Sequence, residues 1–162
     1  MSTPRVKPPP GKAAGYDRTA GRRRLPGLQN DAVVGAAGEG RISAASRADH
    51  VEAAAVVLTA DGHAGAVYEL GGDESFTLTE LAAAISAAAG KPVACSDFPV
   101  ADSAQLLAAA GLPGELAEVR ADADRGMSRG EMYTDSGDLR RLIGRPPVTL
   151  AEALAVALRF SG

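Results

Sequence analysis

The residues best suited to chemistry in this 162-residue chain lie together at Ser46-Arg47-Ala48-Asp49-His50. The run places a hydroxyl, a guanidinium, a carboxylate and an imidazole where a strand-like segment gives way to a helical pattern. The first turn of a helix carries free backbone N–H groups and a partial positive charge, which suit a phosphate or a carboxamide. Ser46, Arg47 and Asp49 are therefore candidate ligand-binding residues.

The same residues also have a purely structural interpretation. Serine followed three residues later by an acid resembles a capping box, although the usual acid there is glutamate. In that interpretation Ser46 and Asp49 cap the helix, and Arg47 is solvated. The spacing alone leaves both interpretations open.

A glycine-rich segment at Gly35-Ala-Ala-Gly38-Glu39-Gly40 has the spacing G-x-x-G-x-G, the reverse of the dinucleotide-binding fingerprint. That fingerprint needs a strand before the glycines and a helix N-terminus after them. Here a strand-like segment follows, and Glu39 places a carboxylate where a pyrophosphate would sit. We interpret the segment as a simple turn.

Two further kinds of site are not indicated. No tyrosine is followed four residues later by a lysine, so the acid–base pair usual in short-chain dehydrogenases is absent. His50 and His63 have no second histidine at metal-ligand spacing, and a single cysteine, Cys95, excludes a Cys-rich zinc site. We therefore expect no metal site.

Composition and charge limit the possible partners. Hydrophobic residues make up 46% of the chain, but many are alanine, and aromatic residues are only 4%. Because burial contributes only ~25 cal/mol per Å² of apolar surface, we expect a thin core that would benefit from a partner surface. The net charge of −3 divides into a basic stretch, Met1–Asn30, and an acidic remainder, which makes the body a poor binder of nucleic acid.

No apolar run approaches the ~20 residues that span a bilayer, and no apolar stretch follows the basic start as in a secretory signal. We therefore expect no membrane partner and a cytoplasmic location. Residues 1–30 include five of the ten prolines and lack apolar periodicity, which predicts a disordered basic tail. Residues 31–162 form the predicted folded region.

The folded region alternates strand-like and helical patterns, which predicts an α/β fold with two or three short strands and about five helices. Strands are expected at 41–45, 66–70 and 92–96. Helices are expected at about 47–60, 81–89 with a cap at Thr77 or Thr79, 102–110, 114–123, 136–143 and 150–160, the last capped by Thr149. Residues 124–135 are expected to be irregular.

Three stretches are informative through their order and spacing. The first runs from Gly35 to His50, and the second combines Gly65–Gly72 with Phe76–Leu81. The third joins Gly111-Leu-Pro113, Ala121–Asp124, Leu142-Ile-Gly-Arg-Pro146 and Thr149-Leu150. Together they resemble the C-terminal half of bacterial NAD(P)H:quinone oxidoreductases of the NmrA-like, atypical short-chain dehydrogenase family.

The resemblance implies the C-terminal, substrate-side part of an extended Rossmann-type fold, with the first Rossmann strands and the Gly-rich loop missing. It implies NADP or NAD as cofactor, a quinone as substrate, and a place for Ser46, Arg47 and Asp49 beside the cofactor or substrate cleft. The basic, proline-rich stretch before Asn30 departs from the family, as a truncated or frame-shifted reading frame would. We expect this chain alone to bind NADPH weakly or not at all, and to be inactive.

Three functional interpretations remain: a truncated quinone oxidoreductase, an NmrA-like non-catalytic module that senses a ligand or binds a protein, and a relic domain. The predicted strand Ala66–Leu70 would present a free edge without its neighbours, and a free edge can pair with another chain. We therefore also expect the chain to self-associate or to be only marginally folded.

Overall fold

A computed structural model describes residues 32–109 and 111–159; the predicted disordered tail, 1–30, lies outside the described residues. Within them the elements follow in the order β1 (Ala32–Gly35), α1 (Arg47–Thr59), α2 (Leu78–Ala89), β2 (Ala94–Asp97), α3 (Val100–Ala109), α4 (Gly114–Ser128), α5 (Asp138–Ile143) and α6 (Leu150–Arg159). The predicted mixture of strands and helices is confirmed as a mixed α/β arrangement. None of the described helices is long and apolar enough to cross a membrane.

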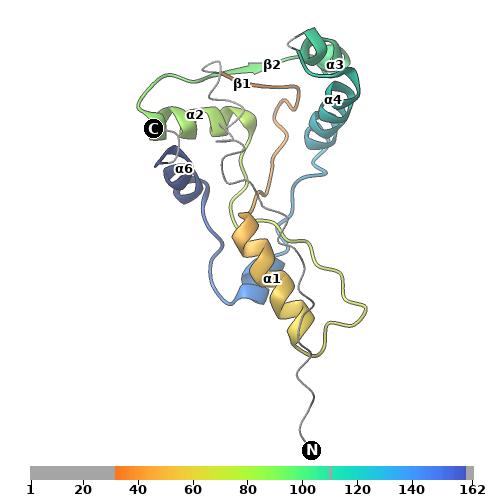
Figure 1. Ribbon diagram of the computed structural model, residues 1–162, viewed down its shortest axis with the longest axis vertical. Helices are drawn as coiled ribbons and strands as arrows, with labels where there is room; N and C mark the ends of the chain where they lie inside the picture. The colour runs from red at the N-terminus through yellow and green to blue at the C-terminus, as the bar shows by residue number, and fades with distance from the viewer. Residues whose placement is uncertain (1–31, 110, 160–162) are drawn as a thin grey trace, which may run out of the picture.

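The sheet consists of β1 and β2, which pair in parallel with Val33 opposite Cys95 and Val34 opposite Ser96. The connection between them contains α1 and α2, and α2 packs on both strands. Figure 1 shows the two strands at one end of the molecule with α2 beside them. The sequence indicated the second strand at 92–96, but residues 32–35 only as a short apolar segment.

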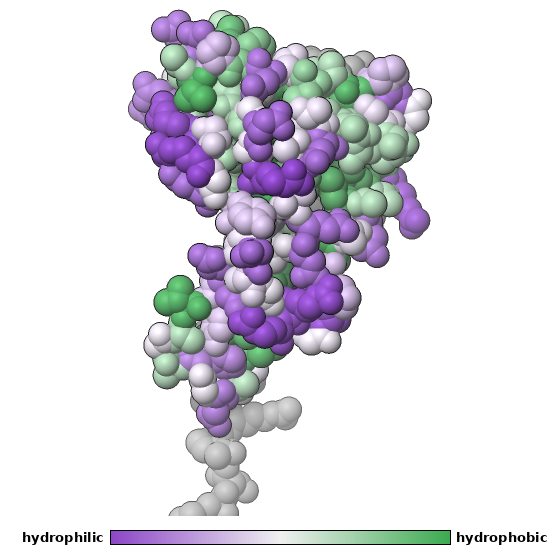
Figure 2. Space-filling view, turned by 180° about the vertical axis from the view of Figure 1, so that it is seen from behind, coloured by the Kyte–Doolittle hydropathy of each residue, from purple (hydrophilic) through white to green (hydrophobic). Residues whose placement is uncertain are grey.

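Two separate hydrophobic clusters lie among the described residues. The larger lies between the sheet, α2 and α6, and consists of Val33, Ala37, Leu78, Ala82, Ile85, Val93, Met127 and Leu154. The smaller joins α1 to α5 through Ala53, Leu139 and Ile143. In Figure 1, α1 and α5 form a lower part apart from the sheet, and Figure 2 shows the molecule narrowing between the two parts, with more apolar surface on the upper one.

Local signals explain where α2 begins and ends. The Thr77 hydroxyl accepts a hydrogen bond from the Glu80 N–H, and the Glu80 carboxylate accepts one from the Thr77 N–H, which completes a capping box. Gly90 closes the helix with φ 65°, a left-handed conformation that glycine adopts without steric cost. Of the two residues predicted as possible caps, Thr77 and Thr79, the cap is Thr77, so the helix begins at Leu78, three residues earlier than expected.

The predicted strand at 66–70 is wrong, because the segment is irregular. At Glu69 and Leu70, side chains and not a neighbouring strand bond the backbone. The Glu69 N–H donates to Asp138, the Glu69 carbonyl accepts from the Ser136 hydroxyl, and the Leu70 carbonyl lies 3.0 Å from the His50 ring nitrogen Nε2. The expectation of self-association through this edge therefore loses its basis.

The segment 41–45, also predicted as a strand, makes only an isolated antiparallel bridge between Ile42 and Phe76. Residues 124–128, predicted as irregular, are instead the last part of α4, so the glycine at 126 did not end the helix. The first residues of the predicted 136–143 helix are outside α5, which starts after Gly137 at φ 66°.

Candidate functional site

The site begins at the N-terminus of α1. Ser46 is the N-cap, with extended backbone angles of φ −70° and ψ 150°, and its hydroxyl oxygen accepts a hydrogen bond from the Asp49 N–H at 3.0 Å. The Ser46 hydroxyl in turn donates to the Asp49 carboxylate at 2.8 Å. The cap predicted at Ser46 is confirmed, whereas the Asp49 carboxylate bonds the Ser46 hydroxyl and not, among the described contacts, the Ser46 N–H that a capping box requires.

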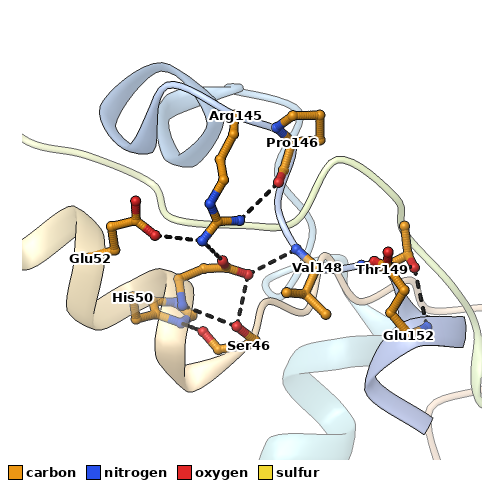
Figure 3. A network of polar contacts seen from close by, with 9 residues as sticks. Ser46, His50, Glu52, Arg145, Pro146, Val148, Thr149 and Glu152 are labelled. Carbon is orange, nitrogen blue, oxygen red and sulfur yellow. Dashed lines mark hydrogen bonds and ion pairs between the residues drawn. The ribbon is translucent and has the colours of Figure 1, made fainter. Parts of the chain in front are cut away.

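Asp49 is fully buried, and donors from a distant loop surround its carboxylate. Its Oδ2 accepts from the Val148 N–H at 2.9 Å, and its Oδ1 accepts from the Arg145 guanidinium at 2.7 Å. Arg145 also pairs with Glu52, one turn further along α1. Figure 3 shows this network, which ties the start of α1 to the loop between α5 and α6.

The electrostatics of the network favour ionised partners. Burial acts to raise the pKa of Asp49, but the hydrogen bonds from Val148, Ser46 and Arg145 outweigh it, so the pKa of Asp49 lies below its ordinary value. The hydrogen bond to Asp49, with that to Glu52, raises the pKa of Arg145. A buried charge of this kind is tolerated only when it is paired and hydrogen-bonded, as it is here.

A pocket of about 200 Å³ opens beside this network. Residues from three segments, 44–46, 72–76 and 146–153, form its wall, and Arg140 of α5 completes it. Its apolar side chains are those of Ala44, Ala45, Phe76, Pro146, Pro147, Val148, Leu150 and Ala153. The pocket therefore suits a small group with a mainly apolar surface.

Charged residues also line this pocket. The Arg140 guanidinium donates two hydrogen bonds to the Asp73 carboxylate, one of them 2.7 Å long. Glu74, the next residue after Asp73, also lines the pocket. Asp73 belongs to the loop before α2, so this ion pair joins the 72–76 segment of the pocket to α5. The arrangement can bind and orient a ligand; neither histidine of the chain is among the residues lining it.

Both histidines have partners elsewhere. The two ring nitrogens of His50 lie 2.9 Å from the Ser46 carbonyl and 3.0 Å from the Leu70 carbonyl, so the ring links α1 to the irregular 66–70 segment. His63 lies 2.7 Å from the Tyr68 hydroxyl. Within the described residues no group of three or more His, Cys, Asp or Glu side chains could hold a metal ion.

The glycine-rich segment forms a turn, as predicted, and does not resemble a pyrophosphate cradle. Gly38 has φ 53°, and its N–H donates to the Asp97 carboxylate at 3.0 Å. The Ala36 N–H donates to the buried Asp124 carboxylate at 3.1 Å. Because carboxylates already occupy these donors, and the isolated bridge at Ile42 follows in place of a helix, the segment does not fit a dinucleotide phosphate.

A second motif, which the sequence reasoning missed, is Gly126-Met-Ser128-Arg-Gly130, with the G-x-S-x-G spacing of a hydrolase nucleophile. That motif needs a strand-to-helix turn, whereas here it ends α4. The Ser128 hydroxyl donates to the Arg125 carbonyl at 2.8 Å, as a helix-end serine often does. The structural context of a nucleophile is therefore absent.

The three residues predicted to bind a cofactor lie in different environments. Ser46 lines the pocket, Asp49 is buried beneath it, and Arg47 is exposed, with no hydrogen bond or ion pair to the rest of the described chain. Arg145, Val148 and Phe76 were not predicted as site residues. Their distance from Ser46 in the sequence does not predict that they lie beside it. Arg145-Pro146 and Phe76 are, however, within the stretches on which the family resemblance rests.

These features define the chain as an α/β unit with a short parallel sheet and an apolar pocket, and without a dinucleotide-binding glycine loop in its described part. No protein-family model matches the chain. The chain is 46% identical, over 128 residues, to quinone oxidoreductase 2 from Escherichia coli strain K12, a match that covers 79% of this chain and 45% of that protein. It is 33% identical to the NAD(P)H azoreductase of Xenophilus azovorans over 71% of this chain and 40% of that protein.

Solved structures of reductases also match this chain over part of their length. The E. coli NADPH-dependent quinone oxidoreductase complexed with NADPH superposes with a TM-score of 0.78 at 45% identity, covering 82% of this chain and 47% of that one. The Citrobacter sp. triphenylmethane reductase complexed with NADP(H) superposes with a TM-score of 0.74 at 33% identity, covering 81% and 46%. The chain thus spans about half the length of the relatives it matches. The resemblance found in the sequence is confirmed as a partial match: the chain aligns with about half of quinone oxidoreductase 2 and of related reductases.

Proposed function

We propose that this chain is the C-terminal, substrate-side half of a cytoplasmic NAD(P)H:quinone oxidoreductase, and that its apolar pocket holds the quinone ring. The observation that carries the proposal is the pocket itself. Its wall contains Ser46, Phe76, Thr149 and Leu150, all of them within the stretches that resemble the family. A cavity of about 200 Å³ with mainly apolar side chains suits one substituted ring.

The nicotinamide cofactor would be held mainly by another part of the enzyme. The carboxylates bonded to the 36–38 turn support this division, because they would repel a pyrophosphate. Of the three predicted cofactor-binding residues, Ser46 and Asp49 are hydrogen-bonded to each other, and Arg47 is exposed. We therefore assign Ser46 a place in the wall of the quinone pocket, Asp49 the positioning of the helix start, and Arg47, which does not line the pocket, a contact with the cofactor.

A chimera tests this proposal. The matched segment of E. coli quinone oxidoreductase 2 is replaced by residues 32–159 of this chain, and NADPH oxidation is followed with a benzoquinone as acceptor. We expect quinone-dependent oxidation. A chimera that folds and binds NADPH but does not reduce the quinone would contradict the proposal, and would favour the non-catalytic ligand-sensing module.

A matched pair of variants locates the substrate. Val148→Phe in the chimera places a phenyl ring in the pocket while keeping the Val148 N–H that donates to Asp49. Val156→Phe makes the same change on an exposed side chain of α6. We expect Val148→Phe to raise the KM for quinone about tenfold or more, equivalent to a loss of ~1.4 kcal/mol of binding, and Val156→Phe to leave it unchanged. Equal KM values would place the quinone elsewhere.

A further inference from the structure

A second, polar pocket adjoins the apolar one. It has a volume of about 160 Å³ and shares Gly72 and Asp73 with the apolar pocket. A Cβ on Gly72 would lie 2.3 Å from the Ala44 carbonyl oxygen, so the chain between the two pockets is closely packed and carries no side chain at this point. A substituent on a ring in the apolar pocket would therefore have the polar pocket next to it. The residues that line the polar pocket are Ser43, Gly71, Gly72, Asp73, Ser75, Tyr133, Thr134, Asp135 and Gly137.

Some polar groups of this pocket are already bonded to one another, and others are free. The Ser43 hydroxyl donates to the Thr134 carbonyl at 2.8 Å and accepts from the Thr134 N–H at 3.1 Å. The Asp135 carboxylate and the Tyr133 hydroxyl, in contrast, make no hydrogen bond or ion pair with the described residues. These two side chains are therefore available to a ligand.

The polar pocket is negatively charged. Asp73 and Asp135 line it, and no lysine, arginine or histidine does. Two guanidinium groups lie close by, but each is already paired with a carboxylate: Arg140 with Asp73, and Arg41 with Glu80. Asp135 thus has no countercharge among the described residues. A phosphate or a carboxylate would be repelled here, whereas a positively charged group would be attracted.

An ammonium group matches these acceptors better than a hydroxyl group does. It carries a positive charge and three N–H donors, and both carboxylates and hydroxyl oxygens accept hydrogen bonds. Asp135 supplies the carboxylate, and Ser75 and Tyr133 supply hydroxyl oxygens in the same pocket. Glu74 also lacks a partner among the described residues, but it lines the apolar pocket, where the ring is placed.

We propose that the polar pocket is a subsite for an ammonium-bearing side chain of the molecule whose ring lies in the apolar pocket, and that Asp135 recognises the charge. The inference rests on the proposed function for the position of the ring. It narrows the substrate class to ring compounds with a cationic side chain, and it disfavours those with a carboxylate or phosphate side chain. Asp135 determines specificity and takes no part in hydride transfer.

Three matched ligands test the subsite. 2-Phenylethylamine, 2-phenylethanol and 3-phenylpropanoate have the same ring and the same two-carbon linker, and differ in the group at the end. Their binding to the purified 162-residue chain is followed by NMR titration of the isotope-labelled protein. We expect the amine to bind about three to five times more tightly than the alcohol, which is near the upper limit of what an exposed ion pair contributes. The carboxylate should bind more weakly than the alcohol.

Variants at Asp135 identify the group that recognises the charge. Asp135→Asn keeps the shape of the side chain and removes its charge, so the amine should then bind no better than the alcohol. Asp61→Asn makes the same change at an exposed aspartate that lines neither pocket, and should leave the preference unchanged. Glu74→Gln should affect the amine less than Asp135→Asn. Circular dichroism melts show that each variant is folded; because Asp135 is exposed, its substitution should not unfold the chain.

A change in the apolar pocket tests whether the ring and the charged group bind together. Val148→Phe fills the apolar pocket and should weaken the binding of all three ligands. Amine binding that is unchanged in Val148→Phe would mean that the chain attracts cations in general, and would overturn the subsite. So would a chain that binds none of the ligands, equal binding of the amine and the alcohol, a preference that survives Asp135→Asn, or a larger loss for Glu74→Gln than for Asp135→Asn.

The proposed function is judged separately by the chimera, because a benzoquinone without a side chain does not need the polar pocket. A chimera that reduces the quinone, combined with equal binding of the amine and the alcohol, would support the proposed function and refute the subsite. Preferential binding of the amine, lost in Asp135→Asn, combined with an inactive chimera would support the subsite and refute quinone reduction.

Discussion

Arg145 and Asp49 are 96 residues apart in the chain, yet the Arg145 guanidinium donates to the fully buried Asp49 carboxylate at 2.7 Å. The contact joins the start of α1 to the loop that leads into α6, and Glu52 on α1 pairs with the same guanidinium. Ser46 and Val148 complete the shell of donors around Asp49. This ion pair between distant segments therefore helps to hold the wall of the pocket beside them.

Removal of Arg145 is expected to destabilise the chain strongly. Arg145→Ala leaves the Asp49 carboxylate buried without its countercharge, and the loss of one partner of a buried ion pair costs about 3–5 kcal/mol. We expect a value near the lower limit, because the Ser46 and Val148 donors remain and Arg145 is 43% exposed. Urea unfolding gives the free-energy difference.

Glu52→Gln is the matched control for this experiment. It removes only the exposed half of the Arg145 pairing, and exposed pairs contribute about 0–1 kcal/mol. If Arg145→Ala and Glu52→Gln lowered the free energy of unfolding equally, the buried Asp49 carboxylate would not be the main contributor to the stability of the network.

The low pKa of Asp49 predicts how stability depends on pH. A carboxyl whose folded pKa lies below its ordinary value of 3.8 stabilises the fold above that value, and the contribution is lost as pH falls through the folded pKa. Asp49→Asn should therefore be less stable than the wild-type chain at neutral pH. The difference in stability between the two proteins should become smaller below about pH 4. Melting temperatures of both proteins between pH 7 and pH 3 test this, since the other carboxyls contribute equally to both. A gap that stays constant across this range would contradict the assignment.

A tight backbone contact at Gly40 predicts a packing defect. A Cβ on Gly40 would lie 2.2 Å from the Met127 carbonyl oxygen, so the turn and the end of α4 would have to separate. Overpacking of this kind typically costs ~1–3 kcal/mol. We expect Gly40→Ala to lower the free energy of unfolding by that amount. Gly114→Ala, where a Cβ meets nothing within 4 Å, should be neutral or slightly stabilising in the same denaturation assay.

The cap of α2 gives a prediction about the helix that covers the sheet. Thr77→Ala removes the hydroxyl that accepts from the Glu80 N–H and should cost ~1 kcal/mol. Thr59→Ala, whose hydroxyl bonds to the Ala55 carbonyl at the exposed end of α1, should change stability by less than about 0.5 kcal/mol. Chemical denaturation of both variants distinguishes the two threonines.

Local signals in the sequence were enough to predict that the helices exist, although not where each of them starts and ends. Ser46, Thr77 and Thr149 stand at helix starts as expected, because a cap is decided by residues within one turn. The strand-like alternation of residues 66–70 failed for the opposite reason. A strand needs a neighbour to pair with, and here the side chains of Asp138 and Ser136 satisfy the backbone instead.

The site was only partly visible in the sequence. The run from Ser46 to His50 marked the correct helix start, but nothing in its spacing indicated that Asp49 would be buried or that Arg145 would pair with it. Long-range pairs of this kind depend on how the helices pack, which composition and periodicity do not specify. The family resemblance came closer, because it included the Leu142–Pro146 stretch that carries Arg145.

The distance in sequence between Asp49 and Arg145 also has a kinetic consequence. Closing a loop of 96 residues costs, by chain statistics, about 4 kcal/mol in conformational entropy beyond a constant, whereas the Ser46 cap closes within one helical turn. The ion pair should therefore form after the folding transition state, and the cap before it. Loss of Arg145 would then accelerate unfolding and leave the refolding rate almost unchanged, so that the lifetime of the folded chain, more than its speed of formation, depends on this one guanidinium.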